Sequence, residues 1–207
     1  ACLGLLSIVT FLFLIDYAAR MLRPVSIVAR VGESGLAVIR SVYPEQSSHP
    51  RTHEPSRKLP PPDRIVVHAG ASGSVLAVNL KALVAQARYS GGIIEFVPQI
   101  GDFLAADEPL FRLYGGAGSI DERKLRAEVA TGTERTMEQD PTFALRILVD
   151  IAIKALSAAI NDPTTAVLAI DQLQRLLRRV GLQDLRGDEI CDKAGELRLI
   201  LRTPNWE

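Results

Sequence analysis

Charged and amide side chains are concentrated between residues 134 and 171, in a stretch of the chain that is otherwise apolar. Arginine guanidinium groups bind anions, whereas carboxylate and amide oxygens suit hard cations. These residue types therefore allow a pocket for a small anion or an ion, whose identity the sequence does not give. The candidate ligand-binding residues are Glu134, Arg135, Arg146, Asp150, Asn161, Asp162 and Asp171.

The same residues also have a structural explanation, and both explanations stay open at this stage. Asp140 and Asp162 each precede a proline, and an acidic side chain followed by proline is typical of a helix start. Asp171 stands four residues before Arg175, which is the spacing of an ion pair on a helix surface. Helix caps and ion pairs would therefore use much of this polar run without any ligand.

Recognisable constellations for catalysis or metal binding are not present in the sequence. Ser157 lacks the flanking glycines of a nucleophile elbow, and His68 has no histidine, cysteine or acid beside it. His49 and His53 have helical metal-ligand spacing, but the prolines around them disfavour a helix. We expect no metal site and no cofactor, and enzymatic activity has no motif to support it.

Composition narrows the class of protein further. Of the 207 residues, 47% are hydrophobic and 23% are charged, which is typical of a folded chain and not of a disordered one. Lys plus Arg and Asp plus Glu both number 24, and a net charge of zero argues against nucleic acid as a partner. The two cysteines, Cys2 and Cys191, cannot form a disulfide framework.

The first residues of the chain predict a membrane anchor. No charge occurs from Ala1 to Ile15, and we expect residues 1–23 to form a transmembrane helix that begins before the first residue given. Arg20, Arg23 and Arg30 come next, and positive residues flank the cytoplasmic side of membrane helices. The predicted location is the cell membrane (inner membrane), with the lipid bilayer as a partner and the soluble region facing the cytoplasm.

The next two segments connect this helix to the rest of the chain. Residues 24–43 predict an amphipathic helix next to the membrane, which either lies at the interface or packs against the following domain. Residues 44–63 hold six of the twelve prolines and predict an extended linker.

Two further segments complete an α+β fold. Residues 64–118 predict a small β-rich, barrel-like module, which is followed by a helix that Ser119 caps. Residues 119–207 predict a helical domain, continuing past the end of the sequence, with a helix pair and a terminal hairpin at 189–201. The helix expected at 141–160 is apolar on nearly every side, so we expect it to be buried, with the charged stripe Arg146, Asp150 and Lys154 paired.

The helical segment also carries a family resemblance. The runs Glu134-Arg135-Thr136, Gln139-Asp140-Pro141, Leu148-Val149-Asp150-Ile151-Ala152, Asn161-Asp162-Pro163-Thr164-Thr165-Ala166 and Asp171-Gln172-Leu173 resemble a bacterial family of predicted membrane proteins, the domain of unknown function numbered twenty-two fifty-four. The resemblance covers essentially the whole chain. It implies several N-terminal membrane helices before a cytoplasm-facing region, and no assigned activity.

Two functions are consistent with these observations. The first is a membrane-anchored structural or assembly protein, forming a homo-oligomer and supporting a channel or transporter. The alternative is a membrane-tethered sensor that binds an ion or small anion through the polar run at 134–171.

Overall fold

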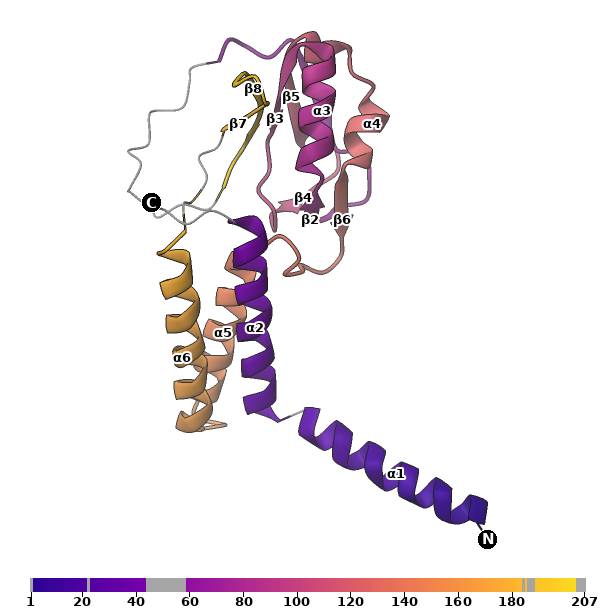
Figure 1. Ribbon diagram of the computed structural model, residues 1–207, viewed down its shortest axis with the longest axis vertical. Coiled ribbons are helices and arrows are strands. Elements are labelled where there is room, and N and C mark those ends of the chain that lie inside the picture. Colours follow the sequence, from indigo (N-terminus) through magenta and orange to yellow (C-terminus); the bar gives the residue numbers. More distant parts are fainter. Residues whose placement is uncertain (1, 22, 44–58, 184, 186–188, 204–207) are drawn as a thin grey trace. The chain divides into compact units, whose positions relative to one another are not determined.

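The computed structural model describes residues 2–21, 23–43, 59–183, 185 and 189–203 (Figure 1). The contacts group the chain into two compact units. The first unit comprises Ala1–Ala37 and Ala144–Gly181, and the second comprises Val38–Phe143 and Leu182–Glu207. The predicted domain boundaries at 64–118 and 119–207 remain a prediction. Most of the predicted linker, with His49 and His53, lies outside the described residues.

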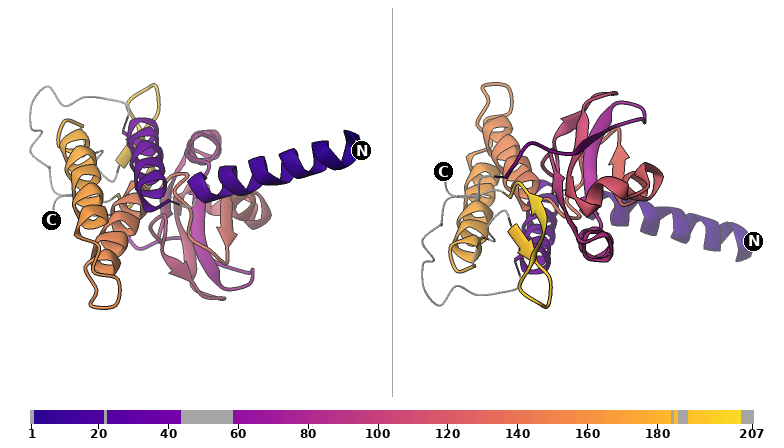
Figure 2. Two further views of the ribbon diagram at one scale, coloured as in Figure 1. Left: turned by 90° about the horizontal axis from the view of Figure 1, so that it is seen from below. Right: turned by 90° about the horizontal axis from the view of Figure 1, so that it is seen from above.

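The first unit is helical. Its elements are α1 (Cys2–Met21), most of α2 (Pro24–Val42), most of α5 (Pro141–Ala155) and α6 (Pro163–Val180). Figures 1 and 2 show α2, α5 and α6 side by side. A Cβ atom at Gly35 would lie 2.9 Å from Ala144 Cβ and 2.9 Å from Leu176 Cδ1. Glycine therefore allows the three helices to pack closely, and the amphipathic helix predicted at 24–43 is confirmed.

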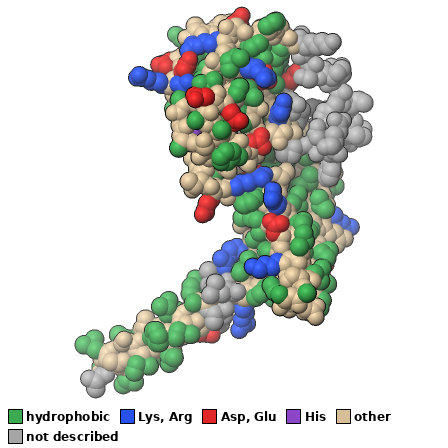
Figure 3. Space-filling model, turned by 180° about the vertical axis from the view of Figure 1, so that it is seen from behind, with side chains coloured by type: hydrophobic (Ala, Val, Ile, Leu, Met, Phe, Trp, Pro, Cys, Tyr) green, Lys and Arg blue, Asp and Glu red, His purple; other side chains and the backbone are tan. Residues whose placement is uncertain are grey.

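Helix α1 differs from the other helices of this unit. All its described side chains, from Cys2 to Ala18, are exposed, although most are apolar. Hydrophobic side chains cover it in Figure 3. Within the part of the chain that the structure describes, no helix has both the length and the hydropathy needed to cross a membrane. The span predicted at 1–23 is therefore not confirmed.

Helix α5 is shorter and less buried than the sequence predicted. It ends at Ala155, and the connection to α6 is a tight turn in which Asp162 N donates to Ala155 O at 2.8 Å. One face is buried through Ala144 and Leu148, but Val149 and Ile153 remain 41% and 66% exposed. The expectation of a buried helix is wrong because α2 and α6 cover only one side of it.

The second unit contains two β-sheets in place of the expected barrel-like closure. One sheet has the order β1-β5-β3-β8-β7 and the other β4-β2-β6. Their strands are β1 (Arg64–Val67), β2 (Gly73–Val78), β3 (Gly92–Phe96), β4 (Phe103–Leu104), β5 (Pro109–Gly115), β6 (Val129–Gly132), β7 (Glu189–Cys191) and β8 (Leu197–Leu201). The described residues form no closed barrel, and the fold class α+β is confirmed.

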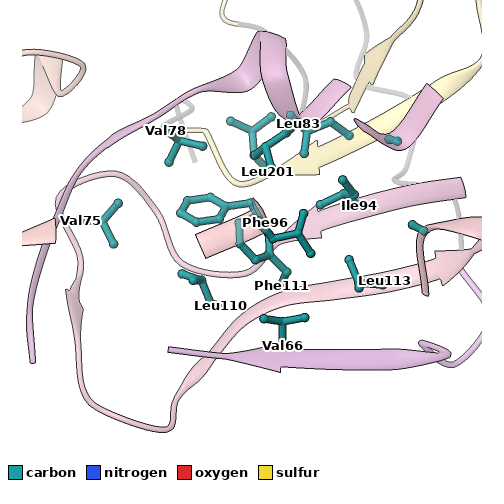
Figure 4. Packing of buried hydrophobic residues seen from close by; sticks show 14 of the residues in the cluster. Val66, Val75, Val78, Leu83, Ile94, Phe96, Leu110, Phe111, Leu113 and Leu201 are labelled. Atoms are coloured by element: carbon teal, nitrogen blue, oxygen red, sulfur yellow. The ribbon is translucent and has the colours of Figure 1, made fainter. Parts of the chain in front are cut away.

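The terminal hairpin completes the larger sheet. Strands β7 and β8 pair in antiparallel fashion as predicted, and β8 then runs parallel to β3, with Ile94 opposite Leu199. Residues from both ends of this unit thus share one core, in which the rings of Phe96 and Phe111 lie 5.5 Å apart (Figure 4).

Helices and a 3-10 turn cover this core. Helix α3 (Leu80–Ser90) is capped by Asn79, whose Oδ1 accepts from Ala82 N, and it ends at Gly91, where φ is 71°. The turn η1 (Gly116–Ser119) precedes α4 (Glu122–Ala127). Asp121, and not Ser119, caps α4, because its Oδ1 accepts from Arg123 N at 2.9 Å.

Candidate functional site

A buried carboxylate lies at the start of α5 in the second unit. Asp140 is 2% exposed, and Arg135 Nε donates to its Oδ2 at 2.5 Å. Its Oδ1 accepts from the Thr142 hydroxyl at 2.5 Å and from Phe143 N at 3.0 Å. Asp140 therefore caps α5, as the Asp-Pro sequence predicted, and both of its oxygens are bonded within the protein.

Arg135 pairs with the carboxylate of Asp140 and also contacts Thr142 and Phe143. Besides Asp140, its Nη2 donates to Thr142 Oγ1 at 3.1 Å, and its Cζ lies 5.2 Å from the ring centroid of Phe143. A buried charge is tolerated only when it is paired and hydrogen-bonded, and here both conditions are met. Gly101, with φ of 92°, makes room for the pair, since a Cβ atom there would collide with Asp140 Oδ2 and the guanidinium group.

Two residues outside the predicted set also belong to this cluster. Tyr43 is 2% exposed, and its burial, followed by the charge of Asp140, raises the pKa of its hydroxyl above 10.0. Gln139 Oε1 accepts from Val78 N at 3.0 Å and so ties the segment before α5 to β2. Sequence reasoning missed Tyr43 and Gly101, because nothing in their local sequence indicates that they lie against Asp140.

A cleft of about 880 Å³ opens beside the cluster, within the second unit. Tyr43, Gln139 and Asp140 line it together with apolar residues such as Ile190 and Leu201. Besides Asp140, its charged lining residues are Lys81, Glu128, Glu138 and Arg202. Apolar walls with a few polar groups are common in small-molecule sites. The bonds that Asp140 already makes favour a structural role for it at this wall.

The seven predicted ligand-binding residues are divided between the two units. Glu134 is exposed and Arg135 is in the buried cluster, and both belong to the second unit. The other five belong to the first unit. A common site built from all seven remains a prediction, and the described residues contain no group of three or more possible metal ligands.

On α5, the predicted charged stripe is exposed and not buried. Arg146 Nε lies 3.9 Å from Asp150 Oδ2, and the two side chains are 69% and 67% exposed. Lys154 is also exposed. The expected pairing of Arg146 with Asp150 is present, but the expected burial is wrong, because the stripe lies on the exposed side of α5.

Of the predicted residues at or near α6, Asp162 caps the helix, and Asn161 and Asp171 are exposed. Hydrogen bonds from the Thr165 side chain and then from backbone amides lower the pKa of the Asp162 carboxyl below 3.8. Asn161 precedes it with φ of 46° and is exposed, as is Asp171. Arg175 donates to Glu33 Oε1 at 2.7 Å, which corrects the predicted pairing of Arg175 with Asp171.

Comparison with known proteins identifies a family but assigns no activity to it. The family model described as "Predicted membrane protein (DUF2254)" matches residues 1–207. An uncharacterized protein of Mycobacterium bovis and one of Mycobacterium tuberculosis are each 30% identical over 213 residues. The match covers 99% of this chain and 40% of each relative, so the chain spans less than half of their length. No solved structure matches the chain.

Proposed function

Because the chain belongs to the family of predicted membrane proteins that this model describes, we propose that it is a membrane-anchored structural or assembly protein. In this proposal α1 lies in the bilayer, and the rest of the first unit and the second unit form a folded region on the cytoplasmic side. The folded region serves to assemble copies of the protein, or to support a channel or transporter.

The observation that carries the proposal is the surface of α1. Between Cys2 and Ile15 it has no charged residue, and its large apolar side chains are 50–84% exposed. Burial of apolar surface is favourable by about 25 cal/mol per Å², so such a helix gains stability when lipid replaces water around it. The arginines at 20, 23 and 30 favour a cytoplasmic position for the residues after α1, because basic residues are retained on that side.

The assembly role is supported by the apolar faces of α5 and α6. Val149 on α5, and Ile170 and Leu177 on α6, are 41–51% exposed. Large apolar side chains left exposed on neighbouring helices mark an interaction site where they form one patch, and we propose that they do so here. The carboxylates of Asp140 and Asp162 are hydrogen-bonded within the chain, which supports a structural role for these two residues of the polar run over a role in ligand binding.

Extraction of membranes tests the anchor. We expect the full chain to stay with the membrane after an alkaline wash, whereas Leu12→Lys, which places a charge in the middle of α1, moves it toward the soluble fraction. The matched control Ala85→Lys, which adds the same charge at an exposed position of α3, leaves the distribution unchanged. Equal release of all three proteins would refute anchoring by α1.

Cys191 provides a natural test of orientation, since it is free and exposed. In a Cys2→Ser variant, a thiol reagent that does not cross membranes is expected to label Cys191 only after the cells are permeabilised. Labelling in intact cells would place the second unit outside the cytoplasm.

Native mass spectrometry in mild detergent tests assembly. We expect a defined oligomer that dissociates in Ile170→Glu, while Gln174→Glu, an exposed polar position on the same helix, leaves it intact. A monomer in the unmodified chain would refute the assembly role. A reproducible bound mass that disappears in Arg146→Ala or Asp150→Ala would instead support the sensor alternative.

A further inference from the structure

The turn between α5 and α6 lies at the same end of the helix bundle as the start of α2. Gly32 contacts Gln172 and Gly35 contacts Leu176, so α2 and α6 run in the same direction. Eleven residues before Gly35 is Pro24, and eleven before Leu176 is Thr165, a distance of about 16 Å along each helix. The turn directly precedes α6, and Figure 1 shows it at the same end of the three helices as the beginning of α2.

This turn is ordered and apolar. Asn161 N donates to Ser157 O at 2.8 Å, and Ile160 N donates to the same oxygen at 3.1 Å, so its backbone conformation is fixed by its own hydrogen bonds. Residues 155–160 carry no charge, and Leu156 and Ile160 are 58% and 50% exposed. Loops that face water are normally polar, because apolar groups gain nothing from exposure.

Further exposed apolar residues lie toward the same end of the bundle. Ile153 at the end of α5, Val167 in the first turns of α6 and Val25 at the start of α2 are 66%, 56% and 53% exposed. We select five residues toward this end of the bundle that are large, apolar and at least half exposed, and call them the apolar tip, namely Val25, Ile153, Leu156, Ile160 and Val167.

We propose that the apolar tip inserts into the headgroup region of an anionic bilayer, beside the point where α1 leaves it. The inference rests on the proposed anchoring by α1. Helix α1 ends at Met21 and α2 begins at Pro24, so the chain between them spans no more than about 10 Å. An anchored α1 therefore holds the start of α2, and with it the apolar tip, close to the lipid surface.

The charges around the apolar tip suit an anionic surface. Lys154 and Arg23 are both exposed there, and long basic side chains can keep their apolar stems in lipid while the charge reaches the headgroups. The carboxylate of Asp162 accepts bonds from Thr165 instead of projecting from the turn. Basic groups beside exposed leucine and isoleucine are the pattern of surfaces that bind the membrane interface.

Depth-dependent quenching tests this placement. The full chain, with Cys2→Ser and Cys191→Ser, is labelled with an environment-sensitive fluorophore at Leu156→Cys and reconstituted into phosphatidylglycerol and phosphatidylcholine vesicles. The label at position 156 is expected to emit at shorter wavelength than in water and to be quenched by brominated acyl chains. Arg178→Cys is the matched control, because it lies about 22 Å from the start of α6 and its label should not be quenched.

A third label at Leu12→Cys separates the two proposals. Quenching at position 12 without quenching at 156 would overturn the insertion of the apolar tip and leave the anchor standing. Absence of quenching at position 12 would overturn the anchor itself. A shift at 156 that brominated lipid does not quench would mean that a second copy covers the turn, and would also overturn the inference. Ile160→Cys repeats the measurement at a second exposed site, so that one poorly folded variant does not decide the result.

Discussion

Replacement of Asp140 by alanine should destabilise the second unit strongly, because its carboxylate is buried and bonded to Arg135, Thr142 and Phe143. Loss of a helix-capping side chain costs about 1 kcal/mol. Removal of one partner from a fully buried ion pair costs about 3–5 kcal/mol. Arg135 is 27% exposed, so water screens this pair in part, and we expect the loss of the ion pair to cost only about 1–2 kcal/mol. The free energy of unfolding should therefore fall by about 2–3 kcal/mol in total.

Urea unfolding of the full chain in mild detergent, followed by circular dichroism, measures this change. With a slope of about 2 kcal/mol per molar urea, the midpoint should fall by about 1–1.5 M. The matched control is the exposed pair Arg146 and Asp150 on α5, where Asp150→Ala should cost no more than about 0.5 kcal/mol. Equal effects of Asp140→Ala and Asp150→Ala would refute the argument from burial.

The double variant with Arg135→Ala makes the test sharper. Arg135→Ala alone leaves a carboxylate that is 2% exposed without its cation. The cost of the double variant should therefore be clearly less than the sum of the two single ones, because the second substitution removes the unpaired group that the first creates. Additive costs would show that the two side chains act independently, against the 2.5 Å contact between them.

Three further outcomes are expected from the packing and the titrating groups. Gly35→Ala should lower stability by about 1–3 kcal/mol in the same urea assay, because its Cβ would lie 2.9 Å from Ala144 Cβ, whereas Gly4→Ala, with nothing within 4 Å, should not. Burial, and then the hydrogen bond to Glu95, raise the pKa of Tyr114 to about 12, so absorbance titration should show this tyrosine ionising late and Glu95→Gln should lower its pKa. The stability that this shift supplies is present below pH 10 and is lost as the pH rises from 10 toward 12. Because the pKa of Asp162 is lowered, the stability from its cap is present above pH 3.8 and is lost as the pH falls through its folded value, so Asp162→Ala should flatten the acid limb of the pH profile.

Local sequence signals gave the elements that depend on neighbouring residues. Asn79 and the Asp-Pro steps at 140 and 162 mark helix starts that the structure confirms, because a cap needs only the next three residues. The hairpin at 189–201 was predictable for the same reason. Ser119 misled because Asp121, two residues later, is an equally good cap, and the 3-10 turn η1 already uses the serine.

Elements that depend on distant partners were not predictable. Strand β6 has only four residues, and its extended form depends on pairing with β2, where Ser74 lies opposite Gly132. Strand β8 pairs in parallel with β3, which lies about a hundred residues earlier in the sequence, and no local sequence pattern encodes such a distant pairing. Of the polar run, the sequence identified Arg135 and the cap Asp140, but not Tyr43 or Gly101, which meet them only in the folded chain.

The sequence of α5 is apolar on nearly all sides, but the burial of the helix that we inferred from this pattern is wrong. Periodicity shows which faces of a helix avoid water, but it does not show what covers each of them. In this chain α2 and α6 cover the face of Ala144 and Leu148, while Val149 and Ile153 stay exposed. The uncovered side of α5 thus carries exposed Val149 and Ile153 next to the charged residues Arg146 and Asp150. In the two proposals, lipid would cover the apolar tip and another copy of the chain would cover the remaining exposed apolar side chains, and the fluorescence and mass spectrometry experiments examine the two contacts independently.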